Sequence, residues 1–299
     1  MMTRPGPEFV PLLLKALNDK SGYVAEAAAR ALGKTGGEGV VQALIERFLW
    51  YSEDGPKRDK SCSARKAIAI ALGKLEDRRA ADALRIGMRT VQLTWDHSDI
   101  AVGLRAACAI SLAEIRADNV LIDLAHMLFD GKPIRPGEDP KGPTRKAAAM
   151  AIAGLAEPGG EIALAIRLMY PEGESPEVLV ECMEAVVAME GENAVRLISP
   201  FLASEDTYLA ANAGLILAKT RNPEVLPLLK AAVTDCPDGA ILPIATAIAS
   251  LRSDEACEAL MELAKDLNPK VRQAAITALE VFPSPKVQAF LKKVTGENE

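Results

Sequence analysis

The feature that most constrains the fold of this chain is a helical segment that recurs along its 299 residues. Val24–Gly33 (VAEAAARALG) and Ala64–Gly73 (ARKAIAIALG) share a pattern of small and apolar residues and end in the same Ala-Leu-Gly. Segments of this kind start eight times, at successive spacings of 40, 40, 40, 35, 30, 32 and 30 residues. Their first residues, the anchors, are Val24, Ala64, Leu104, Thr144, Leu179, Leu209, Ile241 and Val271. Such a period is typical of chains built from stacked, repeated units.

Two further positions keep a fixed distance from the anchor. The residue five positions before it is acidic in most copies: Asp19, Asp59, Asp99, Asp139, Glu174, Ser204, Cys236 and Asp266. The residue twenty positions after it is apolar in every copy but one, where it is Ser199: Leu44, Leu84, Leu124, Leu164, Leu229, Met261 and Leu291. An apolar position held in register at that distance indicates a second helix that packs against the first.

Each copy is therefore expected to contain two amphipathic helices joined by a polar turn. One helix pair cannot bury both of its faces, so neighbouring pairs must stack. Aromatic residues make up 4% of a chain that is 49% hydrophobic, so small aliphatic side chains must fill the core. We predict an all-α solenoid, a superhelix of about eight stacked helix pairs, that forms a single repeat domain over residues 1–299.

The repeated string resembles a known family. In the second copy it consists of Asp59, Ala64, Arg65, Ala67, Ala71, Leu72 and Gly73. This pattern is similar to the HEAT repeat, specifically the short bacterial HEAT-like kind of the phycobilisome lyase type, and the similarity covers residues 7–295. The resemblance supports the solenoid fold, but function cannot be taken from it because such folds carry many unrelated roles.

The resemblance also implies a structural role for the recurring Asp and Arg residues. In HEAT repeats these positions form ladders of bonds between neighbouring units. The residues implied here are Asp19, Asp59, Arg65, Asp99, Arg105, Asp139, Arg145, Asp266 and Arg272. Copies five to seven lack the arginine, with Val180, Ala210 and Leu242 in its place, so we expect the ladder to be interrupted there.

The longer copies differ from the shorter ones in a single region. Because the distance from anchor to leucine stays constant, the extra residues fall before the next anchor, in segments 50–63, 89–102 and 129–143, with a shorter one at 169–177. Units with expanded loops thus occupy residues 38–178, and units of minimal length occupy 179–295. Successive loops at one topological position project from the same edge of a solenoid, and loops on rigid scaffolds often carry function.

These segments are rich in residue types that dominate binding at protein interfaces. We predict a protein-binding surface formed by Trp50, Tyr51, Lys57, Arg58, Arg89, Trp95, His97, Lys132, Arg135 and Lys141. The alternative is that the aromatic residues merely fill gaps beneath the longer loops while the charges are solvated.

Charge is distributed unevenly along the chain. The net charge is −6, but residues 1–150 carry 23 Lys and Arg against 19 Asp and Glu, and residues 151–299 carry 12 against 22, which gives +4 and −10. We therefore expect a non-catalytic scaffold or adaptor whose N-terminal half contacts a protein partner with an acidic surface. The acidic total argues against nucleic acid as the partner. No apolar leader or spanning segment is present, and we expect a cytoplasmic monomer that does not enter a membrane.

Three enzymatic or related alternatives were weighed against the residues. DNA glycosylases of HEAT-like fold use Trp, Asp and Arg, which Trp95, Asp99 and Arg105 would supply, although Asp99 is already explained by the ladder. The iron hydroxylases of this fold need His-Glu pairs, but Ser98 and Met127 follow the two histidines. A lyase or chaperone-like role of the phycobilisome lyase type rests on the repeat alone. We predict no catalytic residue, metal site or cofactor.

The five cysteines include no CxxC pair, so neither a disulfide framework nor a zinc site is indicated. Cys62 falls in an expanded loop beside Arg58, Lys60 and Arg65. Neighbouring cations lower the pKa of an exposed thiol, so Cys62 would be reactive if it lay on the surface. Without a matched histidine, we expect it to be incidental to function.

Overall fold

The computed structural model describes residues 6–130 and 142–295. Within these ranges the chain forms α-helices and short 3-10 helices without any β-strand, apart from an isolated bridge between Leu93 and Asp99. The chain divides into two compact units, Met1–Ala163 and Leu164–Glu299. Each unit is described by itself.

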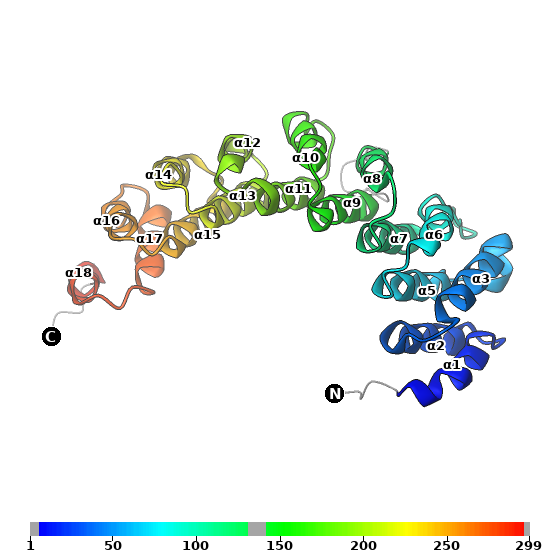
Figure 1. The fold of residues 1–299 in the computed structure, drawn as a ribbon. Helices are drawn as coiled ribbons and strands as arrows, with labels where there is room; N and C mark the ends of the chain where they lie inside the picture. Colours follow the sequence, from blue (N-terminus) through cyan, green and yellow to red (C-terminus); the bar gives the residue numbers. More distant parts are fainter. Residues whose placement is uncertain (1–5, 131–141, 296–299) are drawn as a thin grey trace. The chain divides into compact units, whose positions relative to one another are not determined.

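In the first unit, shorter A helices alternate with B helices that carry the anchors. The A helices are α1 (Val10–Leu17), α3 (Val40–Glu53), α6 (Ala81–Met88) and α8 (Val120–Leu128). The B helices are α2 (Gly22–Thr35), α5 (Ser63–Lys74), α7 (Val102–Glu114) and α9 (Gly142–Leu155). Short elements join them: η1 (Pro7–Phe9), α4 (Gly55–Arg58) and η2 (Arg78–Ala80). Successive B helices pack on one another in chain order, α2 on α5, α5 on α7 and α7 on α9 (Figure 1).

The second unit repeats this arrangement with shorter connections. Its B helices α11 (Pro176–Glu190), α13 (Thr207–Lys219), α15 (Asp238–Ser250) and α17 (Pro269–Leu279) also pack in chain order. The A positions hold α10 (Gly160–Met169), which spans the division, then α12 (Val195–Ile198), α14 (Val225–Asp235) and α16 (Asp254–Leu263). The remaining elements are η3 (Gly191–Ala194), η4 (Ser199–Ala203) and α18 (Pro285–Thr295). The predicted all-α class of stacked helix pairs is confirmed.

The core follows from the repeated small residues. Gly33 on α2 faces Ala71 on α5 so closely that an added Cβ would lie 2.7 Å from the Ala71 Cα. Only a residue without a side chain fits such an approach of two helix backbones. The Leu at the twentieth position is fully buried in copies one to four, as Leu44, Leu84, Leu124 and Leu164. The small and apolar register of the sequence therefore lies at the helix contacts.

Candidate protein-binding surface

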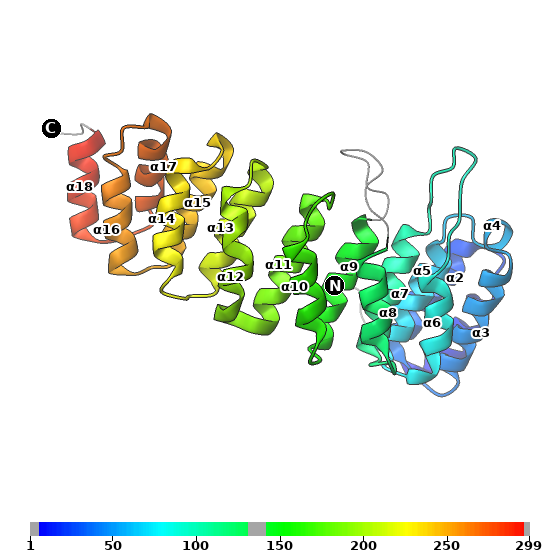
Figure 2. The same cartoon turned by 90° about the horizontal axis from the view of Figure 1, so that it is seen from above.

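The second expanded segment forms a projecting arm, residues 89–101, between α6 and α7. The Ile100 N–H donates to the Gln92 carbonyl at 3.0 Å, and the Thr94 N–H donates to the Ser98 carbonyl at 2.9 Å. These bonds pair the two sides of the arm as in a short hairpin. His97 lies at its tip with φ +64°, in the left-handed region that a tight turn requires. Figure 2 shows the arm rising from the ends of α6 and α7.

One face of the arm is apolar and exposed. The exposed fractions are 65% for Val91, 55% for Leu93 and 94% for Trp95. In an extended chain, alternate residues point to the same side, so these three side chains share a face, while Gln92 lies on the opposite one. The backbone N–H and C=O groups of Val91 and Leu93 have no hydrogen-bond partner in the described part of the chain. The arm thus presents an apolar face beside an open backbone edge.

The opposite face is fixed to the preceding repeat through Gln92. Its Oε1 accepts a hydrogen bond from Arg65 Nη2 at 2.5 Å, and its Nε2 donates to the carbonyls of Asp59 at 3.1 Å and Lys60 at 3.2 Å. Arg65 Nε in turn lies 3.0 Å from Asp59 Oδ2. All three residues of this network, Gln92, Arg65 and Asp59, are buried. The arm is therefore held to the repeat before it by buried, mutually satisfied polar groups.

A second ion pair closes the base of the arm. Arg105 Nη1 lies 2.6 Å from Asp99 Oδ2 and donates to the Thr90 carbonyl at 2.8 Å. Asp99 Oδ1 accepts from the N–H groups of Ala101 at 3.0 Å and Gln92 at 3.2 Å. Burial by itself raises the pKa of Asp99, but these hydrogen bonds outweigh it and hold the pKa below its ordinary value of 3.8. Asp99 is thus an ionised anchor at neutral pH.

The implied ladder needs a correction. The Asp59–Arg65 and Asp99–Arg105 pairs each close within one unit, whereas the resemblance implied bonds between neighbouring units. The step from one unit to the next is made by Gln92, which the repeat pattern does not mark.

The other implied ladder residues use main-chain partners among the bonds described. Arg272 Nη1 donates to the carbonyls of Asp266 at 2.7 Å and Leu267 at 2.8 Å. Arg145 Nη1 donates to the Asp130 carbonyl at 3.3 Å, and the Asp19 carboxylate accepts from the Ser21 N–H at 2.7 Å. Asp139 lies outside the described residues.

Copy five replaces the missing arginine from another position. Arg167 on α10 lies 3.2 Å from the Glu174 carboxylate, and both side chains are buried. The acidic position of this copy is therefore paired, although the anchor segment has Val180 where other copies have Arg. A buried cation in a helix that is otherwise apolar, beside Leu164 and Leu168, is the signal that sequence analysis overlooked.

The first expanded segment is helical, contrary to the expectation of a loop. Helix α3 continues through Glu53, and α4 follows at once. Tyr51 is buried, with 1% of its surface exposed, so its assignment to a binding surface is wrong. Trp50 is 39% exposed, and the guanidinium groups of Arg47 and Arg58 lie over its ring, 4.0 and 4.4 Å from the centroid. Much of the indole is therefore occupied within the chain.

The described cations of the predicted surface already have carboxylate neighbours. Lys57 lies 3.0 Å from Asp54, and Arg58 lies 2.6 Å from Glu53. Arg89, at the end of α6, lies 3.7 Å from Asp123. Lys132, Arg135 and Lys141 fall in a segment that the structure does not describe. The distinctive feature of the edge is thus the apolar face of the arm rather than a patch of uncompensated positive charge.

Cys62 is not the exposed thiol that its neighbours in sequence indicated. Only 2% of its surface is exposed, and it lies under Arg65, whose Nη2 is 3.3 Å from Sγ. Burial raises the pKa of Cys62 to about 11, an effect larger than the opposing influence of Arg65. The thiol is therefore protonated and shielded at neutral pH.

Catalytic and metal chemistry were also sought in the described residues. No group of three or more His, Cys, Asp or Glu side chains is placed to hold a metal ion in that part of the chain. Trp95 is solvated at the arm, whereas Asp99 and Arg105 are paired at its base. The three residues of the glycosylase alternative are thus not gathered around one pocket. Among the described helices, none is long and apolar enough to cross a membrane.

Recurring helix pairs whose B helices pack in chain order define an all-α repeat protein. The family described as HEAT repeats matches residues 3–55 and 240–299, and the family described as PBS lyase HEAT-like repeat matches residues 64–89. The chain is therefore a HEAT-repeat protein, with repeats of the phycobilisome lyase type.

Solved structures with a related helix arrangement are distant in sequence. The complex of CpcE and CpcF of phycocyanin lyase from Nostoc sp. PCC7120 is 18% identical, with 95% of this chain and 94% of that chain covered and a TM-score of 0.48. Human deoxyhypusine hydroxylase in complex with glycerol is 19% identical, with 91% and 95% covered and a TM-score of 0.36. An engineered protein is 18% identical, with 96% and 82% covered and a TM-score of 0.40. No curated protein matches the chain.

Proposed function

We propose that this protein is a non-catalytic scaffold that binds a protein partner through the apolar face of the arm, formed by Val91, Leu93 and Trp95. The observation that carries the proposal is the 94% exposure of Trp95 on an arm whose other face is anchored by buried polar groups. A single exposed apolar residue is ordinary on a protein surface. Three on one face of a braced hairpin form a contact surface with little ordering entropy left to lose on binding.

The partner's charge enters the proposal in second place. An acidic surface would be attracted to Arg89, Lys57 and Arg58, but it would compete with carboxylates of this chain that already lie within ion-pair distance. Exposed pairs of that kind contribute about 0–1 kcal/mol, so charge would tune the encounter rather than supply most of the affinity. We place the protein in the cytoplasm as a monomer in the absence of its partner.

HEAT repeats of this type are compatible with either a scaffold or a lyase-like role. The scaffold is favoured because the arm offers apolar contact area, while the buried groups at its base serve to fix it in place. A lyase-like role would need reactive groups at a substrate site, and Cys62, a thiol that lies near the arm, is shielded and protonated.

The proposal can be tested by affinity capture from the native cells with quantitative mass spectrometry. The tagged wild-type chain is compared with the double variant Leu93→Ser/Trp95→Ser and with Leu267→Ser, which changes a residue of the second unit that is 96% exposed. Proteins that bind through the arm should be lost with the double variant and retained with Leu267→Ser. Unchanged capture by the double variant would contradict the proposal.

A further inference from the structure

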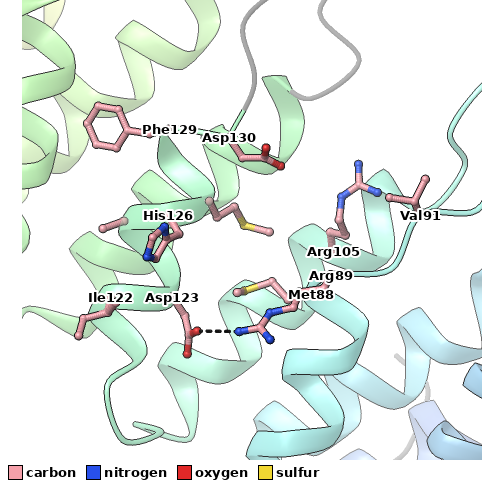
Figure 3. A pocket seen from close by; sticks show the side chains of 11 residues that line it. Met88, Arg89, Val91, Arg105, Ile122, Asp123, His126, Phe129 and Asp130 are labelled. Carbon is pink, nitrogen blue, oxygen red and sulfur yellow. Dashed lines mark ion pairs between the residues drawn. The ribbon is translucent and has the colours of Figure 1, made fainter.

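A groove of about 960 Å³ lies between α6 and α8, at the base of the arm (Figure 3). Apolar side chains of Met88, Met127, Ile122 and Phe129 form much of its wall. Sites for small ligands typically have volumes of this order and combine an apolar lining with few polar groups. The groove therefore has the size and composition of a ligand site, and its polar groups indicate the kind of ligand.

Arg105 provides the unusual polar group of this wall. The residue is 5% exposed, and its Nη1 is used by Asp99 and the Thr90 carbonyl. Its Nη2 is also buried but has no hydrogen-bond partner among the described residues. A buried N–H of a charged group that lacks an acceptor is costly, and native structures rarely leave one unsatisfied. An acceptor oxygen brought by a ligand would remove that cost.

The remaining charged groups of the groove limit what the ligand can be. Asp123 Oδ2 is held by Arg85 Nε at 2.9 Å, and Arg89 lies 3.7 Å from the other oxygen of that carboxylate. Asp130 adds a second carboxylate at the rim, and His126 lies exposed on the same wall. Two carboxylates near the site disfavour a dianion such as phosphate more strongly than a single negative charge.

We propose that this groove binds a monocarboxylate with an apolar body. One carboxylate oxygen accepts a hydrogen bond from Arg105 Nη2, and the body lies against Met88, Met127 and Phe129. Val91 is the side chain that gives access: it follows Thr90, whose carbonyl Arg105 binds, and it is 65% exposed. A rotamer change of Val91 uncovers the guanidinium. The ligand is either a free carboxylic acid or the carboxylate of a peptide, and its binding does not depend on the proposed role of the arm.

Octanoate is a suitable first probe, with octanamide as its uncharged analogue of similar shape. Titration calorimetry at pH 7 measures affinity, and ¹³C-labelled methionine methyl groups report location in the intact chain. We expect saturable octanoate binding that shifts the Met88 and Met127 methyl signals, each assigned with a Met→Leu variant. Octanamide should bind at least about tenfold more weakly because it offers no charged acceptor.

Three variants locate the site. Arg105→Lys keeps a positive charge for Asp99 but removes Nη2, and should weaken octanoate binding by about tenfold or more. Ile122→Asp adds a carboxylate at a residue that is 60% exposed, so it should leave the fold intact and weaken binding by repulsion. Arg79→Lys, in an exposed ion pair with Asp77 away from the groove, is the matched control and should bind octanoate as the wild type does.

A second arm of the experiment distinguishes the two sources of the carboxylate. An apolar hexapeptide with a free C-terminal carboxylate is compared with the same peptide as its C-terminal amide. Tighter binding of the acid peptide than of octanoate would assign the groove to a protein segment, and the reverse would assign it to a free acid. The proposal is overturned if neither acid binds, if octanamide binds as well as octanoate, or if Ile122→Asp and Arg105→Lys leave binding unchanged.

Discussion

Gln92 of the arm accepts a hydrogen bond from Arg65, which precedes it by 27 residues, with 2.5 Å between Oε1 and Nη2. The bond joins two consecutive repeats and fixes which face of the arm is turned inward. Because Gln92 is buried against Arg65 and Asp59, the alternate residues Leu93 and Trp95 remain in solvent. The polar network of one repeat therefore determines the apolar surface that the next one displays.

The first prediction concerns the stability that this network supplies. Arg65→Ala leaves Asp59 buried without its cation and should lower the free energy of unfolding by about 3–5 kcal/mol. Gln92→Ala removes only neutral partners and should cost about 1–3 kcal/mol. Arg79→Ala, in an exposed ion pair with Asp77, should cost less than about 1 kcal/mol. Urea unfolding of the three variants measures these differences, and an Arg65→Ala effect as small as that of Arg79→Ala would show that the buried network contributes little.

A second prediction compares two glycines within B helices. An alanine at Gly33 would place its Cβ 2.7 Å from the Ala71 Cα, which is backbone and cannot move alone. Gly33→Ala should destabilise the chain by about 1–3 kcal/mol. Gly154, inside α9, has open space around the same position, so Gly154→Ala should stabilise the chain by about 0.5–1 kcal/mol through helix propensity. Thermal unfolding distinguishes the two, and effects of the same sign would refute the close approach of α2 and α5.

The third prediction is a dependence on pH at the base of the arm. Hydrogen bonds from Ala101, Arg105 and Gln92 overcome the effect of burial and hold the pKa of Asp99 below 3.8 in the folded chain. The unfolded chain therefore takes up this proton at a higher pH than the folded chain does. The stabilisation by ionised Asp99 is fully present above pH of about 4 and is lost as the pH falls through the lower, folded pKa.

Asp99→Asn isolates this contribution from those of other carboxylates. The difference in unfolding free energy between wild type and Asp99→Asn should be largest at pH 5 to 7 and should shrink towards pH 3. Guanidinium chloride titrations at these pH values provide the measurement. A difference that does not change with pH would mean that the Asp99 carboxylate is not a stabilising anion.

A fourth prediction concerns the reactivity of Cys62. Its pKa rises from an ordinary value of 9.0 to about 11 because the thiol is buried. At pH 8 the thiolate fraction then falls by about a hundredfold, before shielding from the reagent is considered. Iodoacetamide labelling followed by peptide mass spectrometry should therefore find Cys62 modified far more slowly in the native chain than in urea. Cys236, which is only half-buried, should be labelled before it. Equal rates for Cys62 in the folded and unfolded chains would place this thiol on the surface instead.

The helix pairs were predictable because their register is local and repeated. A period of 30 to 40 residues with an apolar residue twenty positions after the anchor determines which faces are buried. Leu44 and Leu84 are fully buried at that position, and the anchors Ala64 and Leu104 are buried as well. Val24 is the exception among the anchors of the first unit, at 40% exposure. It lies in the first B helix, α2, on which α1 and the following B helix pack.

The expanded segments were harder to predict because their paths depend on contacts between repeats. Tyr51 and Cys62 were expected on the surface from their place in long connections, yet the continuation of α3 and the Arg65 network bury both. Arg167 replaces an expected arginine from a different helix, which a fixed spacing cannot reveal. The exposure of Trp95 was consistent with its assignment to a binding surface, while the alternation that separates Leu93 from Gln92 became apparent only in the hairpin. Partner binding by these residues stays a prediction.

The central claim, that the apolar face of the arm contacts a protein partner, is tested most directly by site-specific photo-crosslinking in the native cells. p-Benzoylphenylalanine is placed at Trp95 and, as a control of equal exposure, at Leu267. The account predicts a crosslinked protein from position 95 and not from 267, and its yield should fall when excess wild-type chain competes but not when Leu93→Ser/Trp95→Ser competes. Equal competition by the two chains, or crosslinks from 267 alone, would contradict it.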